Sequence, residues 1–128
     1  MNQYEQFDVV VIGGGASGMM AAITAAMHGK SVVILEKNAS LGQKLDITGG
    51  GRCNITNAEF DIRKFLKNYG DAEPFLHSPF SKFSTKDTFE FFESRGLPLV
   101  VQARNRVFPK TEKATDVGNL LKHEIKKS

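Results

Sequence analysis

The sequence is poor in the residues that would stabilise a small secreted protein or anchor one in a membrane. Cys53 is the single cysteine among 128 residues, which excludes an intrachain disulfide and a four-cysteine metal site. No apolar run approaches the roughly 20 residues that a membrane-spanning helix needs. The first eight residues contain two acidic residues and no basic one, unlike the start of a signal peptide. We therefore expect a cytoplasmic protein without a membrane partner.

Neither positive nor negative charge dominates the sequence. The chain has 17 Lys and Arg against 14 Asp and Glu, for a net charge of +3 and a pI near 9.1. Its most basic stretch, residues 122–127, is typical of a helix C-terminus, where cations suit the helix dipole. The three histidines, at positions 28, 77 and 123, lack the spacing of metal ligands. We expect neither a nucleic-acid partner nor a bound metal.

The residues that are present suit a globular chain of about one domain. Hydrophobic residues make up 41% and charged residues 24%, which is ordinary for such a protein. Residues 8–57 are rich in Gly, Val, Ile and Ala, whereas nine of the 10 Phe lie at or beyond Phe60. This shift, without a low-complexity linker, indicates a change of layer or subdomain within the chain.

Hydrophobic periodicity predicts a strand–helix–strand unit at the start. Residues 8–12 form a short apolar run, typical of a parallel strand covered on both faces. A glycine-rich turn leads into a helix over residues 19–28, which Gly29 ends, and a second buried strand covers residues 31–36. The predicted fold class is therefore α/β, a Rossmann-like domain with a parallel sheet.

The second half predicts shorter elements. A capping box at residues 56–59 is expected to begin a helix that ends at Gly70. A second capping box at residues 84–87 is expected to begin a helix that ends at Gly96. Phe89 and Phe92 fall on one face of that helix and are expected in the core. Residues 97–102 and 106–108 are expected to form a hairpin, and residues 114–127 an amphipathic helix.

The glycine-rich turn matches G-x-G-x-x-G at Gly13, Gly15 and Gly18. In a strand–turn–helix context these glycines permit the tight turn, the approach of a pyrophosphate and close packing of helix on strand. Glu36 follows at the end of the next strand, where a carboxylate can bind the ribose hydroxyls of a dinucleotide and disfavour NADP. A P-loop is excluded, because Met19 stands where its lysine is required. The alternative interpretation is a unit that binds nothing, with Glu36 paired to Lys37.

A second glycine cluster follows soon after this unit. Three glycines at positions 49–51 precede Arg52, so that backbone donors and a guanidinium together suit a diphosphate or an anionic ring edge. The alternative is a flexible loop in which the glycines only serve turns.

The segment QKLDITGGGRCNITN, residues 43–57, resembles the signature of a known family, as do SPFSKF (78–83), RVFPKT (106–111) and ATDV (114–117). The chain is similar over its whole length to the HI0933-like, or aminoacetone-oxidase-like, family of bacterial NAD(P)/FAD-dependent oxidoreductases. This resemblance implies a two-dinucleotide-binding domain with FAD as cofactor, and NAD(P)H as an electron donor is a further expectation. It implies that the following residues lie along the cofactor: Gly13, Gly15, Ala16, Ser17, Gly18, Glu36, Lys37, Lys44, Thr48, Gly49, Gly50, Gly51, Arg52, Cys53 and Asn54.

Family members are several hundred residues long, so we interpret the chain as an N-terminal part that lacks the C-terminal remainder of the same protein. Residues 1–128 are then one incomplete FAD-binding domain, with the strand–helix–strand unit and second glycine loop in 1–57 and a helical and hairpin segment in 58–128. We expect this chain alone to bind FAD weakly or not at all.

Two other function classes are open at this point. One is an NAD-binding dehydrogenase domain, which leaves the second glycine cluster unexplained; the other is a non-enzymatic nucleotide- or RNA-binding module. A disulfide reductase would need a thiol partner for Cys53, and the sequence has none. Neither the substrate nor the catalytic residues follow from the sequence.

Overall fold

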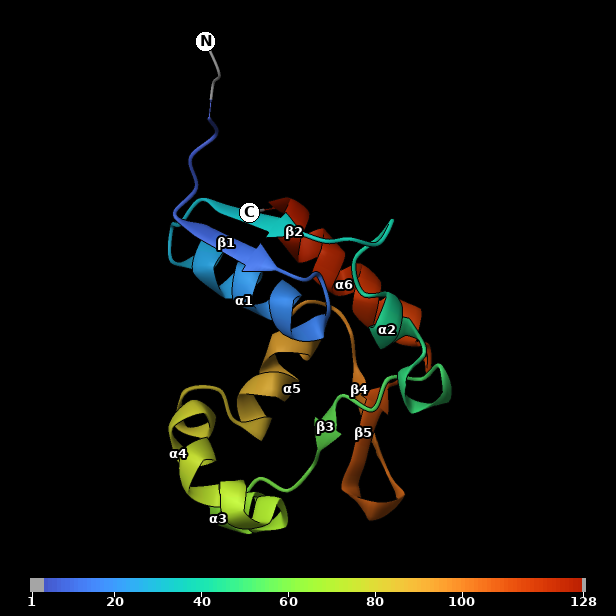
Figure 1. Cartoon of the computed structure of the whole chain (residues 1–128). Helices are drawn as coiled ribbons and strands as arrows, with labels where there is room; N and C mark the ends of the chain where they lie inside the picture. The colour runs from blue at the N-terminus through green and yellow to red at the C-terminus, as the bar shows by residue number, and fades with distance from the viewer. Residues whose placement is uncertain (1–3, 128) are drawn as a thin grey trace. The chain divides into compact units, whose positions relative to one another are not determined.

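A computed structural model describes residues 4–127, which form two compact units (Figure 1). The first unit contains residues 4–53 and 113–127, and the second contains Asn54–Glu112. The C-terminal helix therefore belongs to the same compact unit as residues 4–53.

The first unit is built on the expected strand–helix–strand motif. Strands β1 (Val9–Ile12) and β2 (Val32–Leu35) are parallel, in a register that pairs Val9 with Val32 and Ile12 with Leu35. Helix α1 (Ala16–Met27) begins three residues earlier than predicted, because the turn before it needs only Gly13 to Gly15. These elements confirm the predicted α/β class with a parallel sheet.

Helix α6 (Ala114–Lys127) and the short helix α2 (Gln43–Asp46) complete this unit. Both pack within it, α6 against α1 and α2 against α6. The core consists of side chains that are at most 7% exposed, contributed by all three helices: Met19, Ala22, Ile23, Leu45, Ala114, Val117 and Leu121. The amphipathic pattern predicted for residues 114–127 is confirmed.

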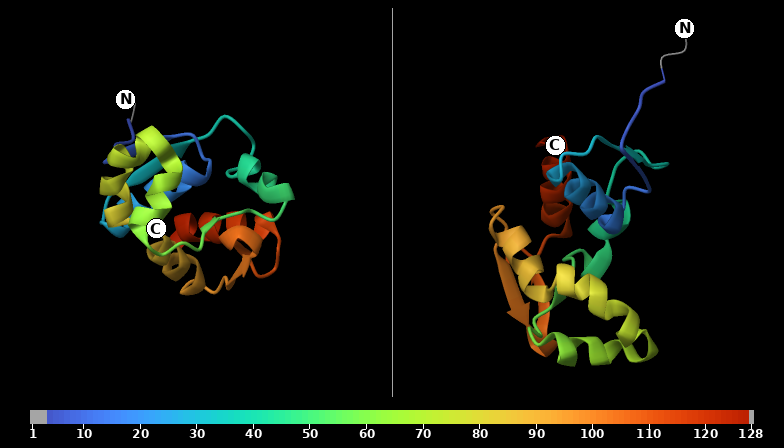
Figure 2. Two further views of the ribbon diagram at one scale, coloured as in Figure 1. Left: turned by 90° about the horizontal axis from the view of Figure 1, so that it is seen from below. Right: turned by 90° about the vertical axis from the view of Figure 1, so that its left-hand side faces the viewer.

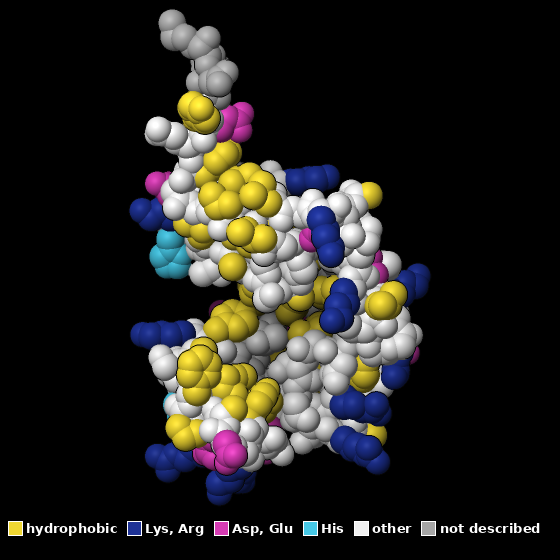
Figure 3. Space-filling view, viewed as in Figure 1, with side chains coloured by type: hydrophobic (Ala, Val, Ile, Leu, Met, Phe, Trp, Pro, Cys, Tyr) yellow, Lys and Arg dark blue, Asp and Glu magenta, His cyan; other side chains and the backbone are white. Residues whose placement is uncertain are grey.

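One face of this sheet is open in the described part of the chain. Val10, Ile12 and Leu35 are 53%, 87% and 54% exposed, and apolar side chains gather over β1 and β2 in Figure 3. The prediction of a strand covered on both faces is therefore wrong within residues 4–127, since α1 packs against one face of the sheet only.

The second unit contains an antiparallel sheet of β3 (Thr56–Asn57), β5 (Arg106–Pro109) and β4 (Leu99–Gln102), in that spatial order. The predicted hairpin is confirmed as β4 and β5, joined by the 3₁₀ turn η3 (Ala103–Asn105), and Figure 2 shows the two strands side by side. Val107 and Phe108 of the central strand are 0% and 1% exposed and lie in the core of this unit.

The capping box predicted at residues 56–59 is wrong, because Thr56 and Asn57 pair with β5 as a strand. The helix begins later, where the Asp61 carboxylate accepts hydrogen bonds from the backbone N–H groups of Arg63 and Lys64. Helix α3 (Ile62–Leu66) and the 3₁₀ turn η2 (Lys67–Ala72) lead into α4 (Glu73–Lys82), which the sequence analysis missed.

The second capping box is confirmed at the start of α5 (Thr85–Glu93). The Ser84 hydroxyl oxygen accepts from the Asp87 backbone N–H (3.3 Å), and the Asp87 carboxylate accepts from the Ser84 backbone N–H (2.6 Å).

The aromatic side chains of this unit divide between core and surface. Phe92 is buried as predicted, whereas Phe89 is half-buried and packs on Phe60 with ring centroids 5.4 Å apart. Phe60 and Phe75 are 56% and 80% exposed, so several Phe side chains of this unit lie on its surface.

Candidate functional site

The first glycine turn joins β1 to α1. Gly13 has a φ of +96°, a conformation that disfavours side chains, and its N–H donates to the Leu35 carbonyl oxygen at 2.8 Å. A Cβ on Gly18 would lie 1.9 Å from the Gly13 carbonyl oxygen. Both glycines are therefore required by the protein's own backbone.

Gly15 is different, because nothing in the protein requires a glycine there. Its φ of −77° and ψ of −173° suit any residue, and an added Cβ would meet no atom within 4 Å. Gly15 is the N-cap of α1, where no side chain accepts a hydrogen bond from the first turn and no acidic residue lies in that turn. The backbone N–H groups at this end, including those of Ala16 and Ser17, have no partner within the helix. The turn thus leaves both space and donors for an anion.

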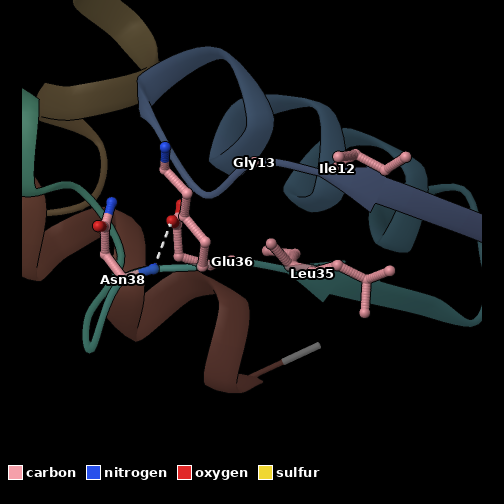
Figure 4. Close-up of a pocket in the computed structure, with 7 residues that line it drawn as sticks. Ile12, Gly13, Leu35, Glu36 and Asn38 are labelled. Carbon is pink, nitrogen blue, oxygen red and sulfur yellow. Dashed lines mark hydrogen bonds between the residues drawn. The ribbon is translucent and has the colours of Figure 1, made fainter.

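Glu36 lies at the end of β2, beside this turn (Figure 4). Its carboxylate accepts from the backbone N–H groups of Gly14, at 2.6 Å, and Asn38, at 2.9 Å. These hydrogen bonds hold the pKa of Glu36 below its usual value, and the bond from the Asn38 N–H has the largest effect. The predicted acid is therefore ionised and held at the glycine turn.

Gly14, which the G-x-G-x-x-G pattern leaves unspecified, hydrogen-bonds the glycine turn to Glu36 and to Gly42. Besides its bond to Glu36, its carbonyl oxygen accepts from the Gly42 N–H at 2.8 Å. A Cβ on Gly14 would lie 2.2 Å from Leu41 Cδ2. Neither Gly14 nor Gly42 was predicted to have a role. The run of three consecutive glycines at 13–15 is the signal that could have identified Gly14.

An open pocket lies beside Gly13 at the carboxyl ends of β1 and β2, where ligands of α/β sheets bind. Glu36, Lys37 and Asn38 line it together with apolar side chains of the strands. Figure 4 labels Ile12 and Leu35 of these strands beside Glu36 and Asn38. Lys37 is exposed, so its ammonium group can reach solvent or a ligand.

The second glycine loop contains the 3₁₀ turn η1 (Thr48–Gly50) and is held against α6. The backbone N–H groups of Gly51 and Cys53 both donate to the Thr48 carbonyl oxygen at 3.0 Å, and the Ala114 N–H donates to the Gly51 carbonyl oxygen at 2.8 Å. Gly49, Gly50 and Gly51 all have positive φ, so the backbone path itself explains these three glycines.

The side chains of this loop differ in accessibility. Arg52 is half-buried and its Nε donates to the Gly49 carbonyl oxygen at 3.3 Å, while Lys44 on α2 is exposed. Cys53 is 7% exposed, and burial raises the pKa of its thiol, which is unlike a reactive thiolate. Asn54 belongs to the second unit, where its amide NH₂ donates to the carbonyl oxygens of Thr56 (3.0 Å) and Val107 (3.2 Å).

Residues 4–127 contain neither a cluster of metal ligands nor a membrane-spanning helix. Over this range, no group of three or more His, Cys, Asp or Glu side chains could hold a metal ion. None of the helices described there has both the length and the apolar character to cross a membrane.

A parallel strand–helix–strand unit, with a glycine turn at the helix N-terminus and an acid at the end of the second strand, defines a Rossmann-type nucleotide-binding domain. The model of the HI0933-like protein Rossmann domain matches residues 7–128. The chain belongs to this family, as the resemblance implied.

Several curated proteins are similar to this chain. The 3-dehydro-bile acid delta(4,6)-reductase of Clostridium scindens is 36% identical over 119 residues, which are 91% of this chain and 28% of that protein. The ribosomal RNA dihydrouridine synthase of Escherichia coli is 27% identical over 96% of this chain and 30% of its own length. The 3-oxosteroid 1-dehydrogenase of Mycolicibacterium smegmatis is 37% identical over 72% of this chain and 16% of its own length. The chain thus spans less than a third of each of these relatives.

Proposed function

We propose that this chain is the FAD-binding part of a flavin-dependent oxidoreductase. The open space at Gly15, next to unpaired backbone donors at the start of α1, is the observation that carries this proposal. When bound, FAD supplies the electron-transfer chemistry, while the protein binds and orients it.

The diphosphate of the cofactor is proposed to lie at the N-terminus of α1. Backbone N–H groups of Ala16, Ser17 and Gly18 would donate to its oxygens, helped by the helix dipole. A glycine at position 15 is needed only if a ligand approaches the backbone closely, because the protein leaves that space empty.

Glu36 is proposed to bind the adenosine ribose. An ionised carboxylate has about four acceptor positions, of which the Gly14 and Asn38 N–H groups use two. The remaining capacity can accept from the ribose hydroxyls, and the negative charge would repel a 2′-phosphate.

The residues from Thr48 to Asn54 are proposed to follow the cofactor toward its flavin, with Lys37 and Lys44 along the way. Arg52 carries the positive charge that would face a phosphate or the reduced flavin. No residue of this chain is assigned a catalytic role. The assignment of residues 1–128 to one FAD-binding domain, and NAD(P)H as the electron donor in the cytoplasm, belong to this same proposal.

The relatives support an oxidoreductase through their names, which include reductases and dehydrogenases. Most of these names refer to ring compounds: a bile acid, a 3-oxosteroid, a cyclohexanecarboxylate and a vinyl phenol. In these relatives most of the length lies outside the similar part, and the corresponding sequence is proposed to complete the cofactor site here.

An NMR titration of the ¹⁵N-labelled chain with FAD tests the proposal even when binding is weak. FAD is expected to shift the amide signals of Gly13 to Gly18 and of Glu36 in a saturable manner. Gly15→Ala should weaken this binding at least about fivefold, because the methyl group occupies the space of the phosphate. The same variant should cost less than about 1 kcal/mol of stability, since the backbone angles suit alanine.

Titrations with NAD and with a short RNA provide the comparison. If NAD shifts these signals and FAD does not, the dehydrogenase alternative replaces the flavoprotein. If RNA alone shifts signals, in a salt-dependent manner, the non-enzymatic module replaces both.

A further inference from the structure

Helix α6 contains a glycine in its interior, where the helix itself gains nothing from one. Gly118 lies in the second turn of this 14-residue helix and is buried. Glycine destabilises a helix interior relative to alanine, because it loses more backbone freedom on folding. The reason for a glycine at position 118 must therefore lie in the atoms that pack against it.

Asp46, the last residue of α2, occupies the space in front of Gly118. A Cβ at position 118 would lie 2.8 Å from Asp46 Oδ1, a distance at which one of the two atoms must move. Leu45 Cδ2 is 3.8 Å from the same position, which is an ordinary van der Waals contact. It is thus the Asp46 carboxylate that requires a glycine here.

The carboxylate oxygen that faces Gly118 has an unusual environment. Asp46 is half-buried, but its Oδ1 is fully buried and has no hydrogen-bond partner among residues 4–127. Leaving a buried oxygen unpaired is costly, so the side chain does not take this position for its own benefit. The packing of α2 on α6, with Leu45 and Leu121 in the core, holds it there (Figure 1).

The second glycine loop follows directly after α2 and is bonded to both helices. At its start the Thr48 hydroxyl donates to the Leu45 carbonyl oxygen at 2.7 Å. At its other end the Ala114 N–H, at the start of α6, donates to the Gly51 carbonyl oxygen at 2.8 Å. All of these residues belong to the first compact unit. The separation of α2 and α6 therefore sets the position of the loop.

We propose that Gly118 is a positioning residue of the second glycine loop. Because position 118 has no side chain, α2 approaches α6 closely, and the loop from Thr48 to Arg52 takes the position in which it meets the flavin half of the cofactor. The effect of Gly118 on the loop follows from the packing alone. The consequence for FAD rests on the proposed function.

NMR spectra of the ¹⁵N-labelled chain without ligand test the effect on the loop. Gly118→Ala is expected to shift the backbone amide signals of Gly49, Gly50 and Gly51. Asp46→Ala removes the atom that the added methyl group would meet, so in that background Gly118→Ala should shift the same signals little. Asn119→Ala is the matched control, since Asn119 is the exposed neighbour of Gly118 on α6.

The rescue by Asp46→Ala keeps this test decisive even if Gly118→Ala unfolds the chain. Unfolding that Asp46→Ala reverses supports the proposal, as do loop shifts that it abolishes. Loop shifts no larger than those of Asn119→Ala would overturn the proposal. Shifts or unfolding that persist in the double variant would overturn it as well.

Titrations with FAD and with ADP measure the consequence for the cofactor. ADP has the adenosine and diphosphate groups that the first glycine turn and Glu36 are proposed to bind, and it lacks the flavin. Gly118→Ala should weaken FAD binding about three- to tenfold, the equivalent of about one lost hydrogen bond, and ADP binding less than about twofold. General destabilisation would weaken both ligands alike.

The two ligands also separate a failure of this proposal from a failure of the previous one. If Gly118→Ala weakens FAD and ADP equally, the positioning role toward the flavin fails and the cofactor site stands. If neither ligand binds the wild type, the proposed function fails, and the spectra without ligand still decide whether Gly118 positions the loop.

Discussion

The glycines of the first turn serve different physical purposes. Gly13 is required by its positive φ and Gly18 by the 1.9 Å approach that a Cβ would make to a carbonyl oxygen. Gly14 is required by the packing of Leu41, and Gly15 by nothing within the protein. A glycine without an internal reason is therefore the residue that points most directly to a ligand.

Glu36 makes the stability of the protein depend on pH. Backbone hydrogen bonds lower its folded pKa, so the stability it contributes is present above the unfolded value of about 4.3 and is lost as pH falls through the folded pKa. We expect Glu36→Gln to lower the melting temperature at pH 7. The two carboxylate oxygens of Glu36 each accept from one N–H group, whereas the glutamine amide has a single oxygen. The difference between the wild type and the variant should shrink as pH falls through the folded pKa of Glu36.

Thermal unfolding followed by circular dichroism between pH 3 and pH 7 measures this difference. Comparing the two proteins at each pH cancels the effects of Asp8 and Asp87, whose pKa values are also lowered by hydrogen bonds to serine. A gap in melting temperature that is constant with pH would contradict the assigned hydrogen bonds.

Among the elements, α5 has the clearest local origin. The reciprocal bonds of Ser84 and Asp87 satisfy backbone N–H groups at its start, and the helix then places Phe91 and Phe92 in the core. Helix α3 begins only where the Asp61 carboxylate can perform the same function. Polar side chains thus determine where both helices start.

Ser84→Ala should lower the free energy of unfolding by about 1 kcal/mol, the usual cost of losing an N-cap. Ser81→Ala is the matched control, because that exposed hydroxyl donates only to the Ser78 carbonyl within α4. The control should change stability by less than about 0.5 kcal/mol. Urea unfolding measures both, and equal losses would show that the cap does not stabilise α5.

At the scale of the whole molecule, two units each have their own core and sheet. The parallel sheet of the first unit leaves Val10, Ile12 and Leu35 exposed, and the pocket beside Glu36 is open. Parallel sheets usually have both faces covered. A cofactor bound here would therefore be incompletely surrounded by the described residues.

We expect this 128-residue chain to bind FAD more weakly than the full-length bile acid reductase of Clostridium scindens, of which the similar part is 28%. Isothermal titration of both proteins under identical conditions, with an absorbance spectrum of each as purified, measures the difference. Retained flavin in the relative and none in this chain is the expected result. Tight, stoichiometric binding by the 128-residue chain would contradict it.

The elements that the sequence predicts well are those with strong local signals. The two parallel strands, the hairpin, α5 and α6 follow from apolar periodicity, caps and terminating glycines. Local signals misplaced the start of α3, because pairing of Thr56 and Asn57 with β5, about 50 residues away, replaced the predicted cap. They also missed α4, in which Pro79 lies inside the helix.

The sequence by itself determined the class of the domain. Gly13, Gly15, Gly18 and Glu36 have the spacing that is typical of a nucleotide-binding strand–turn–helix–strand unit. It also determined the family through residues 43–57. Only the tertiary structure decided that α6 packs with α1, that Gly14 joins Glu36 to Gly42, and that Gly118 faces Asp46. The physical reason is range: propensity and capping act over a few residues, whereas these contacts depend on how distant segments share buried surface and backbone hydrogen bonds.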